Sequence, residues 1–298
     1  MQKRPAPDGS LQNIPQFPFC CPVPSMQEFL FVLASLIVAF ALRCCRTLWL
    51  RKVGAAGFLV STFLTFYFLF DRWWAGLIGV LLWFIAPLVD LFTRFRRMRM
   101  PLGNRITRRE APSPQFFPQA SRIIKELDEA GFEHVEDTAW EWVGMSQFFQ
   151  IFWHAEWHMV ASVCLCEHGD VAFAFVTISG RSLAGDAVHT TNYPFSPALK
   201  HPPGVSWKHL PCEKNSVESI RTEHLKHLEK LSLKPEDLRI PDPDTLVDEI
   251  EAEMAAQIEH NLEHGLISQA EKPDHFRYST RGLFFLWKQT VKDMVRLC

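Results

Sequence analysis

Long apolar runs mark the first part of the chain, and short alternating patterns mark the rest. Three apolar runs follow one another, at about 26–46, 53–70 and 73–92. A helix that crosses the apolar core of a bilayer needs roughly 20 apolar residues, with a lower limit near 17. The second and third runs meet this length, whereas the first crosses only if Arg43 and Arg46 reach back to the headgroups. The pattern predicts two or three transmembrane helices.

The second and third runs are together too long for one spanning helix. About 40 residues at a rise of about 1.5 Å extend roughly 60 Å, which is twice the thickness of the bilayer core. We therefore expect a turn near Asp71 and Arg72, with Trp73 and Trp74 at the membrane interface, where tryptophan is enriched. The two runs are predicted to form a transmembrane hairpin.

Basic residues predict on which side of the membrane the remainder lies. Those after the last run are Arg94, Arg96, Arg97, Arg99, Arg105, Arg108 and Arg109, and those just before the hairpin are Arg43, Arg46, Arg51 and Lys52. The hairpin turn carries only Arg72. Because cytoplasmic flanks are enriched in Lys and Arg, both flanks are expected in the cytoplasm. This predicts a multi-pass protein of the cell membrane with a cytoplasmic C-terminal domain, whether or not the first run crosses.

Residues 118–298 show helical and strand periods in turn. Helical spacing of apolar residues predicts helices at 118–130, 216–231, 245–264 and 280–295. Period-two alternation predicts strands at 132–143, 187–193 and 276–279, and the five prolines of 194–211 predict a long loop. The segment 145–158 fits both a helical stripe and a strand face, and its aromatic density favours the strand.

The clearest local prediction is a β-hairpin of residues 159–167 and 171–179. Gly169-Asp170 between them is typical of a two-residue type II′ turn. This turn pairs Cys166 with Phe173 and Cys164 with Phe175. The predicted fold class is therefore α+β, with N-terminal transmembrane helices followed by an antiparallel sheet with packed helices.

Charge separates the parts of the chain. We divide it into a polar Pro-rich tail (1–25), a transmembrane region (26–92), a basic juxtamembrane linker (93–117) and the α+β domain (118–298).

Residues 1–110 hold 14 Lys and Arg against 5 Asp and Glu, and the remainder holds 17 Lys and Arg against 28 Asp and Glu. The acidic remainder repels phosphate backbones, so we expect no nucleic-acid partner. The basic residues Arg94, Arg96, Arg97 and Arg99 are predicted to contact anionic lipid headgroups.

Histidines and cysteines of the central strands are the candidate metal ligands. His154-x-Glu156-x-His158 lacks the H-E-x-x-H order, and on a strand its histidines lie about 13 Å apart, which Zn–N bonds of about 2.1 Å cannot close. Cys164 and Cys166 are also about 7 Å apart on a regular strand. A site therefore requires side chains of adjacent strands to converge, and its ligands would be His154, His158, Cys164 and Cys166.

Other candidates are weaker. His260 and His264 lie one helical turn apart, a spacing that permits metal binding but also suits cations at a helix C-terminus, which we favour. We find no P-loop, dinucleotide fingerprint or nucleophile elbow.

These patterns favour a membrane-anchored protein with a cytoplasmic interaction or sensing domain and no catalytic residue or cofactor. Its expected partners are the lipid bilayer and another membrane or cytoplasmic protein. The alternative is a metal-dependent, membrane-bound enzyme that uses the His/Cys cluster.

Overall fold

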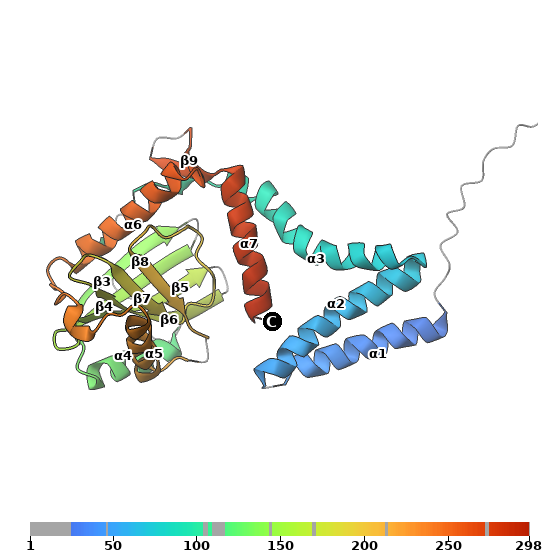
Figure 1. Ribbon diagram of the computed structural model, residues 1–298, viewed down its shortest axis with the longest axis horizontal. Coiled ribbons are helices and arrows are strands. Elements are labelled where there is room, and N and C mark those ends of the chain that lie inside the picture. The colour runs from blue at the N-terminus through green and yellow to red at the C-terminus, as the bar shows by residue number, and fades with distance from the viewer. Residues whose placement is uncertain are drawn as a thin grey trace, which may run out of the picture. The chain divides into compact units, whose positions relative to one another are not determined.

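The apolar runs and the alternating runs fold as separate units. In the computed structural model the chain divides into Met1–Trp83 and Phe84–Cys298, an apolar helical unit and an α+β unit (Figure 1). The structure describes residues 25–45, 47–103, 107–108, 117–142, 145–168, 171–211, 214–271 and 274–297. The predicted polar tail lies outside the described residues, apart from Ser25.

The three apolar runs form three helices, as predicted: α1 (Met26–Arg43), α2 (Leu48–Phe70) and α3 (Trp73–Thr93). All three are long and apolar enough to cross a membrane. Asp71 ends α2 in the left-handed region, with φ of 49°, so the predicted turn is confirmed. The second helix starts earlier than residue 53 because Arg51 and Lys52 extend its first turn rather than ending it.

Small residues bring α1 and α2 into backbone contact. A Cβ atom on Gly54 would lie 2.7 Å from the carbonyl oxygen of Ala39, and one on Gly57 would lie 2.9 Å from the Ala39 Cβ. The hydroxyls of Ser35 and Ser61 are 2.8 Å apart across the same interface. Close packing of small residues with an interhelical hydrogen bond is how helices associate in lipid, where apolar burial gives no driving force.

Seven strands form one sheet in sequence order. They are β2 (Thr107–Arg108), β3 (Glu133–Trp142), β4 (Met145–His154), β5 (Met159–His168), β6 (Val171–Arg181), β7 (Ala187–Thr191) and β8 (Val205–His209). The predicted hairpin is confirmed in its register, with Cys166 opposite Phe173 and Cys164 opposite Phe175. The strand interpretation of the ambiguous segment is confirmed for residues 145–154 by β4, whereas residues 155–158 form a turn, so Glu156 and His158 do not continue the strand face of His154.

Two predictions were incomplete. The predicted loop 194–211 contains β8, which pairs in parallel with β7, so the sheet is mixed rather than wholly antiparallel. The prolines of this loop precede or follow β8 and leave its backbone free to pair. The segment expected to be a linker, 93–117, contains η1 (Phe95–Arg97) and two short strands, β2 and β1 (Met100–Pro101).

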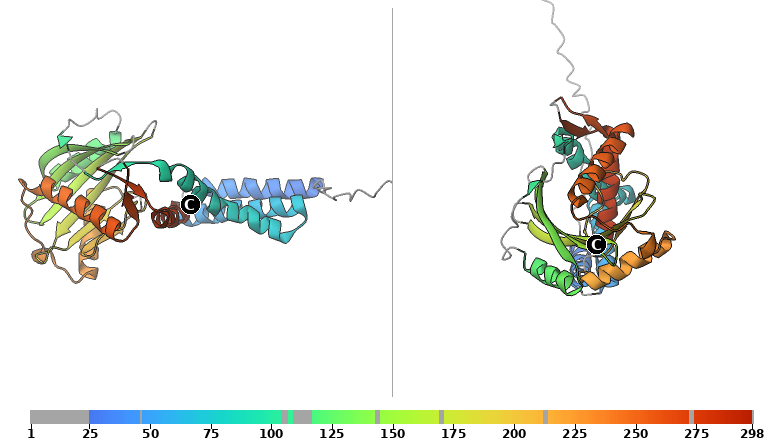
Figure 2. Two further views of the ribbon diagram at one scale, coloured as in Figure 1. Left: turned by 90° about the horizontal axis from the view of Figure 1, so that it is seen from above. Right: turned by 90° about the vertical axis from the view of Figure 1, so that its left-hand side faces the viewer.

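Helices cover both faces of the large sheet (Figure 2). On one face α4 (Pro118–Glu129) and α5 (Val217–Lys230) form the main apolar core, with Ile123, Leu127 and Ile220 nearly inaccessible to solvent. The short turn η3 (Pro235–Asp237) then leads the chain to α6 (Leu246–Glu263). This helix lies over the opposite face, where its side chains meet those of β6 and β7.

A second, smaller core follows α6. The strands β1, β10 (His275–Tyr278) and β9 (Ile267–Gln269) form a three-stranded antiparallel sheet, and α7 (Thr280–Leu297) packs beside it. The part of α3 from Phe84 onward belongs to this core: the indole Nε1 of Trp287 donates to the carbonyl of Phe84 at 2.7 Å, one turn before Pro87. The end of the last apolar helix therefore packs against α7.

Candidate functional site

A cavity of about 380 Å³ lies between α6 and the sheet face opposite the main core. Its floor consists of alternate residues of β3 to β8, and its walls come from α6 and from residues 197–202. We call it the ligand cavity. Strand alternation explains its lining: on β5, Ala161 and Val163 enter the main core, so Val160 and Ser162 face the cavity.

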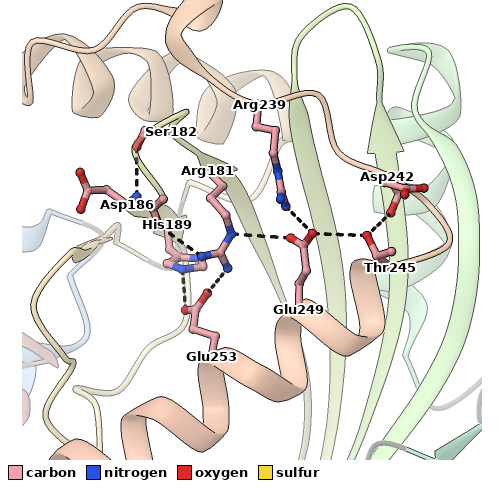
Figure 3. Close-up of polar contacts among 10 residues, drawn as sticks. Arg181, Ser182, Asp186, His189, Arg239, Asp242, Thr245, Glu249 and Glu253 are labelled. Atoms are coloured by element: carbon pink, nitrogen blue, oxygen red, sulfur yellow. Dashed lines mark hydrogen bonds and ion pairs between the residues drawn. The ribbon is translucent and has the colours of Figure 1, made fainter.

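Charged side chains of α6 and the sheet form one network at the edge of this cavity (Figure 3). Arg181 donates to Glu253 at 3.1 Å and lies 3.6 Å from Glu249. Arg239 also pairs with Glu249, so two guanidinium groups offset two carboxylates. Nε2 of His189 lies 2.8 Å from Glu253, although its N–H does not align well as a hydrogen bond.

The network determines the charge of Glu253. Burial raises the pKa of its carboxyl, but the contact with His189 and the charge of Arg181 outweigh burial, and the pKa is lowered overall. Glu253 is therefore a carboxylate at neutral pH. Because Glu253 already pairs with Arg181 and contacts His189, we assign it a role in holding α6 on the sheet.

Three aromatic rings of the cavity lining stack on one another. The ring of Trp207 lies 4.3 Å from that of His189 and 5.1 Å from that of His201, with interplanar angles of 18° and 16°. Burial lowers the pKa of His201 to about 4 and also lowers the pKa of His209. Both imidazoles are therefore neutral at pH 7.

Nε2 of His189 faces Glu253 without a well-aligned hydrogen bond, and two further N–H donors in this stack have no acceptor among the described residues. The side-chain amide of Gln257 donates to Nδ1 of His201 at 3.1 Å, so the proton of the neutral ring lies on Nε2. Nε2 of His201 and Nε1 of Trp207 are buried without a hydrogen-bond partner among the described residues. Buried donors without acceptors cost free energy, so an acceptor atom in the cavity would stabilise both donors, and the described residues supply none.

The comparisons with known proteins assign no function to this site. No family model, no curated protein and no solved structure matches the chain. The chemistry of the cavity must therefore be inferred from its own residues.

The four predicted metal ligands lie in different surroundings. Cys164 and Cys166 are buried with their sulfurs 3.7 Å apart, and burial raises the pKa of the Cys164 thiol. His154 stacks on Trp157 at 4.1 Å, and Nδ1 of His158 contacts the carbonyl of Leu238 at 2.9 Å. No three of the four bring ligand atoms within 4.8 Å of one another. The structure brings only the two cysteine sulfurs close to each other. Metal binding by the four residues therefore stays a prediction.

A different set of residues, among those that the structure describes, does bring three potential metal-ligand atoms close together. Ligand atoms of His260, Glu263 and His264, at the end of α6, lie within 4.8 Å of one another. The sequence signal was the order His-x-x-Glu-His, which places both histidines on one helical face and is known from zinc enzymes. The geometry also fits the helix-end interpretation, because Nδ1 of His264 contacts the carbonyl of His260 at 2.8 Å. Glu263 and His264 are exposed, outside the cavity lining.

The cavity residues were missed because their signal is spread over the chain. Arg181 and His189 lie on neighbouring strands, Trp207 lies in a segment taken for a loop, and Glu253 lies on a helix that appeared only acidic. Only the fold brings these elements together.

The predicted lipid contacts lie elsewhere in the α+β unit. Arg94 pairs with Asp90 at 2.8 Å, whereas Arg96, Arg97 and Arg99 line a second pocket.

Proposed function

We propose that this chain is a membrane-anchored binding protein whose cytoplasmic α+β domain senses a small apolar molecule that carries an acceptor oxygen. The observation that carries the proposal is the ligand cavity with its two unpartnered donors. Its volume of about 380 Å³ falls in the range of small-molecule sites, which is roughly 300 to 1,000 Å³.

The lining supports an apolar ligand. Phe149, Ile151 and Phe175 contribute apolar walls from the sheet, and Met254 and Ile258 contribute them from α6. Small-molecule sites combine such walls with a few well-placed polar groups that orient the ligand. Here those groups are Nε2–H of His201 and Nε1–H of Trp207, and a carbonyl, ether or carboxylate oxygen would satisfy them.

The membrane anchor is supported by the three apolar helices, and its orientation by the basic flanks. The alternative, a metal-dependent enzyme, has less support because its four proposed ligands do not gather within 4.8 Å. Binding therefore explains more of the described geometry than catalysis does.

Filling the cavity tests the binding function. Ser162 faces the cavity from the central strand β5, so a phenyl ring there occupies the ligand's space. We expect Ser162→Phe in the full chain, held in neutral-lipid nanodiscs, to bind prodan at least about tenfold more weakly than the wild type, or about 1.4 kcal/mol. Prodan is a naphthalene with a ketone oxygen, and its fluorescence reports transfer to an apolar site; empty nanodiscs give the background.

Two variants control this experiment. Ala172→Phe adds the same ring at an exposed position of β6 and should leave prodan binding unchanged. Trp207→Phe keeps the stacked ring but removes the N–H, so it should weaken binding less than Ser162→Phe does. Equal prodan affinity in the wild type and Ser162→Phe, with both folded, would exclude the cavity as the site.

The topology has its own test. Fusions of alkaline phosphatase and of a fluorescent protein to the C-terminus, expressed in a bacterial host, should show fluorescence and no phosphatase activity. This result is expected because the arginines after α3 hold that flank in the cytoplasm. Phosphatase activity of the C-terminal fusion would reverse the proposed orientation.

A further inference from the structure

A basic pocket lies where α3 ends and α7 begins. It has a volume of about 590 Å³, and its wall includes Arg96, Arg97, Arg99 and Arg277, together with Ser268 and Thr280. We call these four arginines and the hollow between them the basic pocket. All of its residues belong to the α+β unit, so its shape does not depend on the helical unit.

The four arginines lack the counter-charges that surface arginines normally find. Among the described residues, no carboxylate oxygen lies within 4.0 Å of any of their guanidinium nitrogens, whereas nearby Arg94 is paired with Asp90. Within the part of the chain that the structure describes, the one hydrogen bond of these guanidinium groups is internal: Nη1 of Arg99 donates to the carbonyl of Arg97 at 3.1 Å. Four like charges around one hollow repel one another, and an anion in the hollow removes that cost.

Strand pairing assembles the pocket from distant parts of the chain. In the small sheet, Met100 pairs with Phe276 and Pro101 pairs with His275. Arg277, the next residue of β10, is thereby brought beside the arginines that precede β1. Membrane orientation alone requires positive charge on the segment after α3, but it does not require Arg277, which is nearly two hundred residues further along the chain.

The position of the pocket indicates the source of the anion. Arg96 follows the last residue of α3, Thr93, by three positions, and α3 is long and apolar enough to cross a bilayer. Residues that close to the end of a spanning helix lie at the level of the headgroups, where anionic phospholipids gather basic side chains. Guanidinium groups bind phosphate oxygens through paired N–H donors, which favours arginine over lysine for this contact.

We propose that the basic pocket binds the phosphate of an anionic phospholipid headgroup, and that a phosphate monoester, with its higher charge, binds best. The site is separate from the ligand cavity. It depends on α3 crossing the membrane but not on what the cavity binds.

Native mass spectrometry of the full chain in neutral detergent tests this proposal. Dioctanoyl phosphatidic acid, which carries a phosphate monoester, should be retained at least about tenfold more tightly than dioctanoyl phosphatidylcholine. Arg277→Gln should weaken its binding about fivefold, and the double variant Arg97→Gln/Arg277→Gln about 25-fold, since each basic residue near a membrane contributes about 1 kcal/mol.

Arg281→Gln is the matched control. Arg281 is exposed and lies four positions from Arg277, but its guanidinium donates to the carbonyl of His264 and it is not part of the pocket wall. Equal loss in Arg281→Gln and Arg277→Gln would show general charge attraction and overturn the proposal. Equal retention of both lipids would also overturn it. Displacement of the lipid by millimolar inorganic phosphate would make free phosphate the ligand and overturn the lipid assignment.

Discussion

Gly282→Ala is expected to lower the midpoint of thermal unfolding of the α+β unit by about 6–12 °C. A Cβ atom at this position, in the first turn of α7, would lie 1.9 Å from the carbonyl oxygen of Leu266. That carbonyl cannot easily move away, because it accepts a hydrogen bond from the backbone N–H of Ser279 at 3.0 Å. Overpacking costs about 1–3 kcal/mol, and a clash with backbone lies at the upper end, which gives this shift for a unit of this size.

The measurement is tryptophan fluorescence of the detergent-solubilised full chain during heating. Gly103→Ala is the control, because among the described residues, apart from its chain neighbours, no heavy atom lies within 4 Å of the Cβ that it would add. Its unfolding midpoint should match the wild type. If the unfolding midpoint of Gly282→Ala also matched that of the wild type, the result would contradict the close approach of α7 to the residues before β9.

Acid is expected to destabilise the α+β unit, with His224 as a major cause. His224 is inaccessible to solvent on α5, and burial lowers its pKa to about 3 from its ordinary value of 6.5. The charged groups that face it are His227 on its own helix, His189 on β7 and Lys208 on β8, and all of them lower this pKa further. Nδ1 of the neutral ring lies 3.1 Å from the hydroxyl of Thr190.

The direction of this pH effect follows from the protons that the folded and the unfolded chain bind. Below pH 6.5 the unfolded chain protonates this histidine while the folded chain does not, so the free energy of unfolding falls as pH falls from 6.5 toward 3. At pH 5 this contributes about 2 kcal/mol, which lowers the unfolding midpoint by about 4–8 °C relative to pH 7.5. The lowered pKa values of His201 and His209 act in the same direction.

Two variants separate titration from packing. His224→Gln keeps a polar group near Thr190 but does not titrate, so the difference in unfolding midpoint between pH 7.5 and pH 5 should shrink by about 4–8 °C. Thr190→Val removes the hydroxyl and keeps the imidazole, so it should lower stability at both pH values and retain the pH dependence. An unchanged pH dependence in His224→Gln would rule out this histidine as the cause.

Local patterns predicted the secondary structure well where neighbours in sequence are also neighbours in space. The pairing of Cys164 with Phe175 was predicted from Gly169-Asp170, which lies outside the described residues, and the flanking strands show that register. The strand β8 was missed because its partner, β7, lies beyond a proline-rich segment, and a short parallel edge strand has no turn that marks it.

The candidate site could not be predicted from local sequence patterns, for a related reason. The regular spacing of histidines and cysteines predicted a metal site. In the structure, His154 contacts Trp157 and His158 contacts Leu238. The cavity depends on which strand faces meet α6, and that is determined by the packing of α4 and α5 on the other face. Donors such as Nε1 of Trp207 become unusual only after folding leaves them buried without an acceptor.

The short link between α6 and β9 connects the cavity mechanically to the backbone that follows the last apolar helix. Only three residues separate Glu263, the end of α6, from Ile267, where β9 begins. β9 pairs with β10, and β10 pairs with Met100 and Pro101, which follow the last apolar helix. If the cavity binds a ligand as proposed, a tilt of α6 would pull on β9 and, through β10, on the backbone that follows α3, so occupancy would be transmitted as force through hydrogen-bonded strands.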